Sequence, residues 1–152
     1  MTKWLTEQQQ QHWRAWIAAS SLLSFRLNRE LQEHCDLTLA DYEILVRLSD
    51  QPDRQIRMSD LAELTLSSRS RLTHQVDRME QSGLVLRQVC ADDRRGQLCV
   101  MTDKGWNALV ASAPDHVNSV REHMVDVLSD AEFAALGKAA AKIVAHLESL
   151  DQ

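Results

Sequence analysis

One stretch, residues 67–102, changes its hydrophobic period in the middle and constrains the fold more than any other feature. Before Gly83, three apolar residues share one helical stripe: Leu72, Val76 and Met79. After it come two runs rich in β-forming residues, 84–91 and 97–102, which are separated by the sequence DDRRG. The pattern therefore predicts a helix that is followed by a β-hairpin with two arginines at its tip.

The predicted helix is polar on its remaining sides. Six of its residues lie away from the apolar stripe at about 100° per residue: Ser70, Arg71, Thr73, His74, Asp77 and Arg78. Arginine can bond two guanine acceptors, and a hydroxyl can serve several bases. A polar helix followed by an arginine-tipped hairpin indicates a winged helix that reads DNA, whereas the alternative is a solvated face with no partner.

The formal charge supports this interpretation only when the net charge of residues 66–95 is counted separately from that of the rest of the chain. The whole chain has a net charge of −5, which taken alone argues against nucleic acid. Residues 66–95, however, contain six arginines and four acids, so that this segment carries +2 and the rest −7. DNA responds to the local face rather than to the total charge.

Helices are predicted on both sides of this stretch. Apolar residues recur every three or four positions in 7–34, and more than one side of that helix is apolar. After residue 102 another helix is expected, which Pro114 should kink or restart. Ser129 and Glu132 form a capping box for a last helix.

The segment between the first helix and the polar helix has the spacing of a helix-turn-helix. Thr38 and Asp41 resemble a capping box for a second helix. A short strand is predicted at 57–58, and Ser59 is a plausible N-cap for a third, short helix. Residues 65–68 then form the turn into the polar helix, which is the geometry of a helix-turn-helix.

The predicted fold is mainly α: a winged helix-turn-helix with long terminal helices and a small β-hairpin wing. Residues 36–102 form the DNA-binding domain, and residues 1–35 and 103–152 are dimerisation helices, because their apolar faces exceed what one small domain can cover. The alternative is that the terminal helices pack on the middle as one monomeric core.

Three segments together resemble the MarR family of winged-helix transcriptional regulators: SRSRLTHQVDRMEQSGLV, DDRRGQLCVMTDKG and APDHVNSVREHMVDVLSDAE. The wing motif appears as Asp93-Arg94-Arg95-Gly96, and Met101 stands where the family usually has Leu. The resemblance implies a homodimeric regulator, usually a repressor, often released from DNA by a small anionic or phenolic ligand or by thiol oxidation.

DNA contacts are expected from the polar helix and from the wing. Arg95 is implied by the resemblance to enter the minor groove, with Asp93 as its orienting partner. The full set of expected contacts is Ser68, Arg69, Ser70, Arg71, Thr73, His74, Arg78, Asp93, Arg94 and Arg95. The partner is a palindromic double-stranded operator that one homodimer binds. A winged-helix module that binds protein, or DNA without sequence preference, is the rival hypothesis.

A ligand pocket is expected between the terminal helices and the reading domain. Its candidate residues supply aromatic surface and groups that meet an anion: Trp13, Trp16, Arg26, His116 and Arg121. Tryptophans at helical spacing are more often core residues.

Two cysteines lie near the wing. If the hairpin is centred between Arg94 and Arg95, Cys90 and Cys99 face each other, which suggests a redox switch. Facing Cβ atoms are about 4.5–5.5 Å apart, longer than a relaxed disulfide favours, and burial as small apolar side chains is the commoner role.

The sequence contains no motif that indicates an enzyme, a metal site or a membrane protein. No glycine-rich phosphate loop, metal-hydrolase motif or nucleophile–base spacing is present, so that neither an enzyme nor a cofactor is expected. The six histidines form no HxxxH pair and the cysteines no CxxC pair, so that solvated or packed histidines and no metal site are expected, with a metal-sensing regulator of the same fold as the alternative. Three cysteines, no signal-peptide core and no long apolar run favour a cytoplasmic protein that does not enter a membrane.

Overall fold

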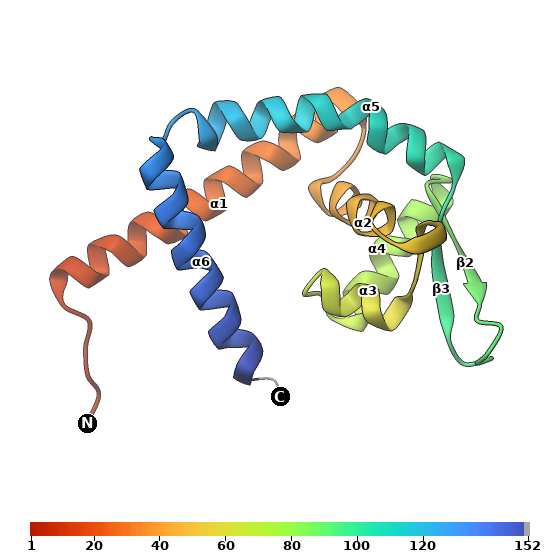
Figure 1. The fold of residues 1–152 in the computed structure, drawn as a ribbon, viewed down its shortest axis with the longest axis horizontal. Helices are drawn as coiled ribbons and strands as arrows, with labels where there is room; N and C mark the ends of the chain where they lie inside the picture. The colour runs from red at the N-terminus through yellow and green to blue at the C-terminus, as the bar shows by residue number, and fades with distance from the viewer. Residues whose placement is uncertain (151–152) are drawn as a thin grey trace. The chain divides into compact units, whose positions relative to one another are not determined.

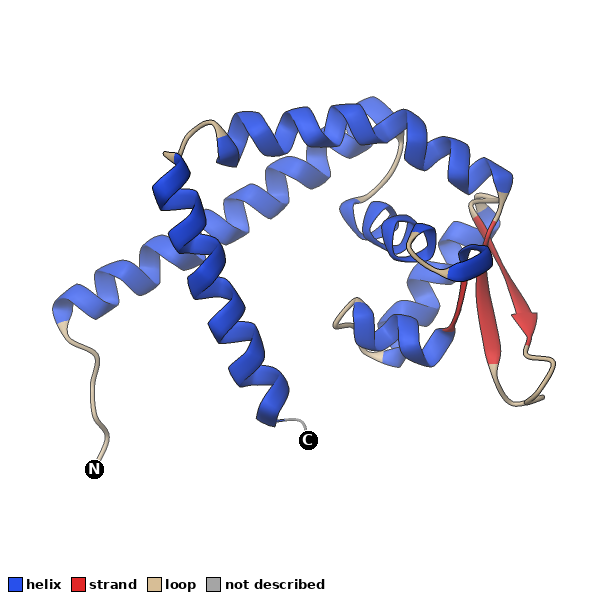
Figure 2. Cartoon of the chain, viewed as in Figure 1, coloured by secondary structure: helices blue, strands red, loops and turns tan. Residues whose placement is uncertain are grey.

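The computed structural model describes residues 1–150. The chain forms two compact units, which divide after His116. The elements in chain order are α1 (Glu7–Cys35), α2 (Leu39–Ser49), the short 3-10 helix η1 (Pro52–Arg54), β1 (Gln55–Arg57), α3 (Met58–Leu64), α4 (Arg69–Gln81), β2 (Val85–Val89), β3 (Gln97–Met101), α5 (Asp103–Val120), the π-helical turn η2 (Arg121–Val125) and α6 (Asp130–Leu150) (Figures 1 and 2). The predicted mainly α fold with a β-hairpin wing is confirmed.

Polar side chains begin and end the helices of the first unit. The Thr38 hydroxyl accepts the Asp41 N–H, and the Asp41 carboxylate accepts the Thr38 N–H, as the predicted capping box requires. Ser68 Oγ accepts the Arg71 N–H at 3.2 Å and so begins α4. Asp36, with φ of 56°, ends α1 in the left-handed conformation.

The predicted cap at Ser59 is wrong. Helix α3 begins at Met58 directly after the strand, and its N-cap, Arg57, provides no side-chain hydrogen bond. Strand β1 occupies Gln55–Arg57, because these residues pair with β3 up to Arg57 opposite Leu98. The N-cap position therefore falls on the last strand residue, Arg57, and Ser59 lies inside the helix.

The sheet has the order β1-β3-β2, and both pairings are antiparallel. Its register differs from the predicted one, since Cys99 lies opposite Arg87, whereas the Cys90 N–H donates to the Gly96 carbonyl. The Gly96 N–H donates to the Asp93 carbonyl and closes a tight turn, so that Ala91 and Asp92 lie between Cys90 and this turn on the β2 side. Cys90 and Cys99 therefore do not face each other, and that prediction is wrong.

A single apolar cluster holds the first unit together. Its buried members come from α2, α3, α4, the sheet, α5 and the segments just before α2 and β2: Leu37, Ile44, Leu45, Leu48, Leu61, Ala62, Leu72, Val76, Met79, Leu84, Val85, Cys99, Met101 and Leu109. Helix α4 contributes the predicted stripe, and β2 and β3 contribute the inward residues of the hairpin. The wing and α4 are thus fixed to the same core.

Helix α5 continues through Pro114, so the predicted restart there is wrong. Proline has no N–H to donate to the carbonyl of Val110, four residues earlier, and Val110 lies on an exposed side of the helix. The break comes instead at η2 and Ser129, whose hydroxyl accepts the Glu132 N–H.

Helix α6 has no buried residue in the single chain. Five large apolar side chains along it are exposed: Phe133, Ile143, Val144, Leu147 and Leu150. No helix within residues 1–150 is long and apolar enough to cross a membrane.

Gly105 permits the close approach of α5 to the hairpin. A Cβ there would lie 2.1 Å from the Leu84 carbonyl oxygen, whereas a Cβ at Gly137 of α6 meets nothing within 4 Å. We expect Gly105→Ala to lower the free energy of unfolding by about 1–3 kcal/mol, because backbone must move. Gly137→Ala should raise it by up to about 1 kcal/mol through helix propensity. Urea unfolding of both variants checks this, and equal stabilities would contradict it.

Candidate nucleic-acid interface

The buried stripe of α4 determines which side of the helix faces solvent. Leu72, Val76 and Met79 are buried in the core. Seven predicted contact residues at the start and along the outside of the helix are exposed: Ser68, Arg69, Ser70, Arg71, Thr73, His74 and Arg78. The structure thus brings these residues to one polar face.

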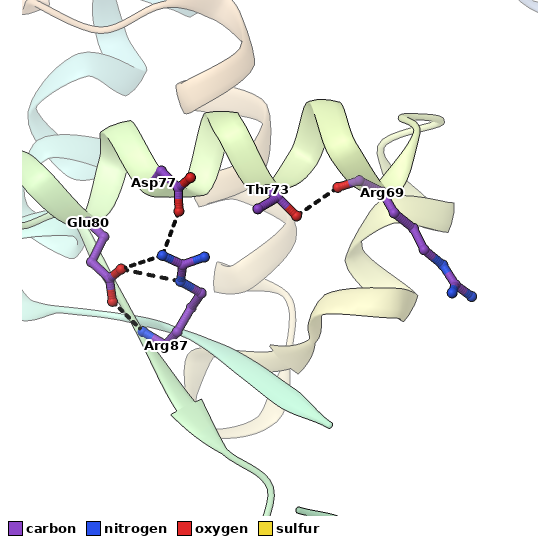
Figure 3. A network of polar contacts seen from close by, with 5 residues as sticks. All are labelled: Arg69, Thr73, Asp77, Glu80 and Arg87. Carbon is purple, nitrogen blue, oxygen red and sulfur yellow. Dashed lines mark hydrogen bonds and ion pairs between the residues drawn. The ribbon is translucent and has the colours of Figure 1, made fainter. Parts of the chain in front are cut away.

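Side-chain contacts divide this face into two parts. The Thr73 hydroxyl donates to the Arg69 carbonyl at 2.8 Å, while the Arg69 guanidinium extends away from the helix (Figure 3). Arg78, two turns later, donates to the side-chain oxygen of Gln75, which itself bonds Asp41 of α2. The first two turns therefore present the exposed side chains of Arg69, Ser70 and Arg71 to solvent, whereas Arg78 is held toward α2.

Arg87 of β2 fastens α4 to the wing. Its Nη2 lies 2.5 Å from Asp77 Oδ1 and 2.8 Å from Glu80 Oε2, and its backbone N–H donates to Glu80 Oε1 at 2.9 Å (Figure 3). Hydrogen bonds from Arg87 lower the pKa of Glu80, and the Glu80 carboxylate raises the pKa of Arg87. The positive charge of Arg87 is thereby neutralised inside the protein rather than offered to a ligand.

The wing turn is organised by Asp93. Its Oδ1 accepts the Arg95 backbone N–H at 3.0 Å, and its Oδ2 lies 3.7 Å from Arg57 Nη1. Asp93 therefore orients the backbone at Arg95, and its ion pair is with Arg57 of β1. Arg94 and Arg95 themselves are exposed at the tip.

A hollow lies between the wing, the start of α3 and the start of α4. We call it the arginine hollow, and its lining includes Arg57, Arg69, Thr73, Asp93, Arg95 and Gly96. Sequence reasoning missed Arg57, because the sequence does not show that β1 joins the sheet beside β3. The short strand predicted at 57–58, which begins with Arg57, was the available signal.

The five candidate pocket residues are mostly exposed or paired on the helix surface. Trp13 and Trp16 are exposed, Arg26 pairs with Glu30 at 3.3 Å, and Arg121 pairs with Asp126 at 2.6 Å. His116 packs on the Tyr42 ring, with centroids 4.3 Å apart. Burial lowers the pKa of His116. None of the five lines the arginine hollow or either of the other two hollows that we identified in residues 35–108.

The wing cysteines have the surroundings of packing residues. Both Cys90 and Cys99 are buried, and burial raises the pKa of Cys99 to about 12. A thiol with that pKa is protonated at neutral pH, and the thiolate is the reactive form. Cys99 therefore lacks the reactive thiolate that a redox switch needs, and it lies opposite Arg87 rather than Cys90.

Loss of the Arg87 contacts should loosen the fold in a pH-dependent way. We expect Arg87→Gln to lower the free energy of unfolding at pH 7 by about 1 kcal/mol, because the pairs are partly exposed to solvent. The Glu80 pKa is lowered in the folded state, so this stabilisation is fully present above its unfolded pKa of about 4.3 and is lost progressively as pH falls from there through the lower folded-state pKa. Urea unfolding at pH 7 and at pH 3.5 checks both parts.

Arg121→Gln is the matched control, since it removes a more exposed pair with Asp126. It should change stability by less than about 0.5 kcal/mol at either pH. A difference between wild type and Arg87→Gln that persists at low pH would contradict the role of Glu80.

Comparison with known proteins identifies similar chains over most of the length. The family model described as "MarR family" matches residues 37–96. The HTH-type transcriptional regulator MhqR of Bacillus subtilis (strain 168) is 32% identical over 108 residues, which are 70% of this chain and 70% of that protein.

Two solved structures from Streptomyces coelicolor are similar throughout. AbsC, a MarR family transcriptional regulator, is 44% identical with a TM-score of 0.91, covering 97% of this chain and 99% of that one. A second MarR family transcriptional regulator, solved in complex with DNA, is 38% identical with a TM-score of 0.92, covering 95% of this chain and 90% of that one.

Proposed function

Because the chain belongs to the MarR family of DNA-binding transcriptional regulators, we propose that it is a homodimeric repressor that binds a palindromic operator. The observation that carries the proposal is the exposed polar face of α4 beside an arginine-tipped wing, both fixed to one core. The structure of the 38% identical relative in complex with DNA supports DNA as the ligand of this chain.

Helix α4 reads the major groove in this proposal. Ser70, Arg71, Thr73 and His74 meet base edges from the first two turns, where recognition helices make such contacts. Ser68, Arg69 and Arg78 contact phosphates on either side. The Thr73 hydroxyl proton is already donated to Arg69, so Thr73 offers DNA its oxygen lone pairs and methyl group.

The wing reaches the adjacent minor groove. Arg94 and Arg95 are exposed at its tip, and a narrow minor groove attracts arginine through its negative potential. Asp93 holds the Arg95 backbone in the turn, which reduces the conformational entropy that the wing loses when DNA binds.

The terminal helices, 1–35 and 103–152, form the dimer in this proposal. They expose apolar side chains that a single chain leaves in water, among them Trp4, Leu22, Phe25, Val144 and Leu147. A two-fold interface would remove them from water and set two recognition helices about 34–36 Å apart, one turn of DNA.

Release from DNA by a small anionic or phenolic ligand stays a prediction of the family resemblance. Trp13, Trp16 and Arg26 are exposed on α1, and no hollow described above is lined by them. Any such ligand acts only through its different affinities for the DNA-bound and released states.

Selection of duplexes from a random pool tests DNA reading. Wild-type protein should enrich an inverted repeat, and Arg71→Ala should weaken binding to it by roughly 10- to 100-fold while relaxing one base position per half-site. Arg29→Ala, which removes an exposed arginine of α1, should bind as wild type does. A pool that stays random would contradict sequence-specific binding.

A matched pair of valine substitutions tests the dimer. Val144 of α6 is 48% exposed and Val89 of β2 is 61% exposed in the single chain. Val144→Glu should raise the dimer dissociation constant at least about tenfold, because it places a charge in the interface. Val89→Glu should leave it unchanged. Sedimentation equilibrium measures both, and a monomeric wild type would contradict the dimer.

A further inference from the structure

Arg57 lies where β1 ends and reaches the wing turn from outside the helix-turn-helix pair. It pairs with Leu98 of β3 in the sheet, so its backbone is fixed beside the hairpin. Its Nη1 is 3.7 Å from Asp93 Oδ2, and a Cβ added at Gly96 would lie 2.9 Å from that same nitrogen. The guanidinium is thus held against the base of the wing.

This guanidinium keeps most of its hydrogen-bonding capacity. Within residues 1–150, the guanidinium has one polar partner, Asp93, and their separation of 3.7 Å exceeds the roughly 2.7–2.9 Å that is usual for a charged hydrogen bond. The Arg57 side chain is 41% exposed and that of Asp93 is 49% exposed. A solvent-exposed pair of this kind is weak, so a second anion can compete with or join Asp93.

The arginine hollow concentrates positive charge at this point. Arg57, Arg69 and Arg95 line it, and Asp93 is the one carboxylate among its described lining residues, which gives a net charge of +2. The three guanidinium groups come from β1, α4 and the wing, so that no single element forms the site. Arginine forks match the oxygens of a phosphate in geometry as well as in charge.

The position of the hollow relative to α4 and the wing points to a DNA phosphate. If α4 enters the major groove and the wing enters the adjacent minor groove, the sugar–phosphate strand that separates the two grooves must pass between them. We propose that Arg57 binds a backbone phosphate of that strand in the arginine hollow. This inference rests on the proposed DNA binding and adds a phosphate contact that fixes position without reading sequence.

Neutralising Arg57 should weaken binding on every duplex. With the duplex that wild-type protein selects, Arg57→Gln should lower affinity at least roughly tenfold and flatten the slope of log affinity against log salt by about one unit per subunit. With a random-sequence duplex, Arg57→Gln should flatten the slope of log affinity against log salt by the same amount. Arg29→Gln, the same change on α1, should alter neither, and thermal unfolding should show both variants folded. An unchanged salt slope for Arg57→Gln would overturn the proposal.

Two double-mutant cycles distinguish a direct phosphate contact of Arg57 from a role in supporting the wing. One combines Arg57→Gln with a modified DNA phosphate, and the other combines it with Arg95→Gln. Methylphosphonate substitution at one phosphate between the grooves should abolish the effect of Arg57→Gln to within about twofold, whereas other phosphates should leave it intact. In an Arg95→Gln background, the effect of Arg57→Gln should persist. The proposal is overturned if the affinity loss caused by Arg57→Gln persists with every methylphosphonate duplex but disappears in the Arg95→Gln background. Arg57 would then act only through the wing. Failure of wild type to bind DNA would instead refute the proposed function.

Discussion

Burial of three side chains on one stripe of α4 is the constraint on which the reading surface depends. Leu72, Val76 and Met79 enter the same core as the hairpin residues Val85 and Cys99. Because a helix turns about 100° per residue, burying this stripe leaves the arginine and hydroxyl side chains on the solvent side. Rotation of α4 would bury charge and expose the stripe, so packing energy holds the polar face outward.

Polar contacts then fix the wing relative to that helix. Arg87 joins β2 to Asp77 and Glu80 of α4, and Asp93 joins the turn to Arg57 of β1. Both carboxylate–arginine systems are within the protein, but they differ in strength. The Arg87 contacts are short and partly buried, whereas the Arg57 pair is long and exposed, which leaves Arg57 available to an external anion.

The helix periods, the caps at Thr38 and Ser129, and the hairpin were predictable, because each depends on residues close together in the sequence. The hairpin register and the start of α3 were not, because they are decided by how β1 and the wing turn pair with β3. Arg57 and Arg87 were missed as fixed contacts for the same reason. The pocket predicted from Trp13, Trp16 and Arg26 depends on packing between helices, on which local periodicity carries no information.

The central claim is that α4 and the wing read adjacent grooves of DNA in two symmetric half-sites. Hydroxyl-radical footprinting of wild-type protein on the duplex that it selects tests this most directly. The account predicts two protected patches related by inversion, with centres about 10–10.5 base pairs apart, each including the backbone between a major and a minor groove. A single unsymmetric patch, or protection spread evenly along the duplex, would contradict it.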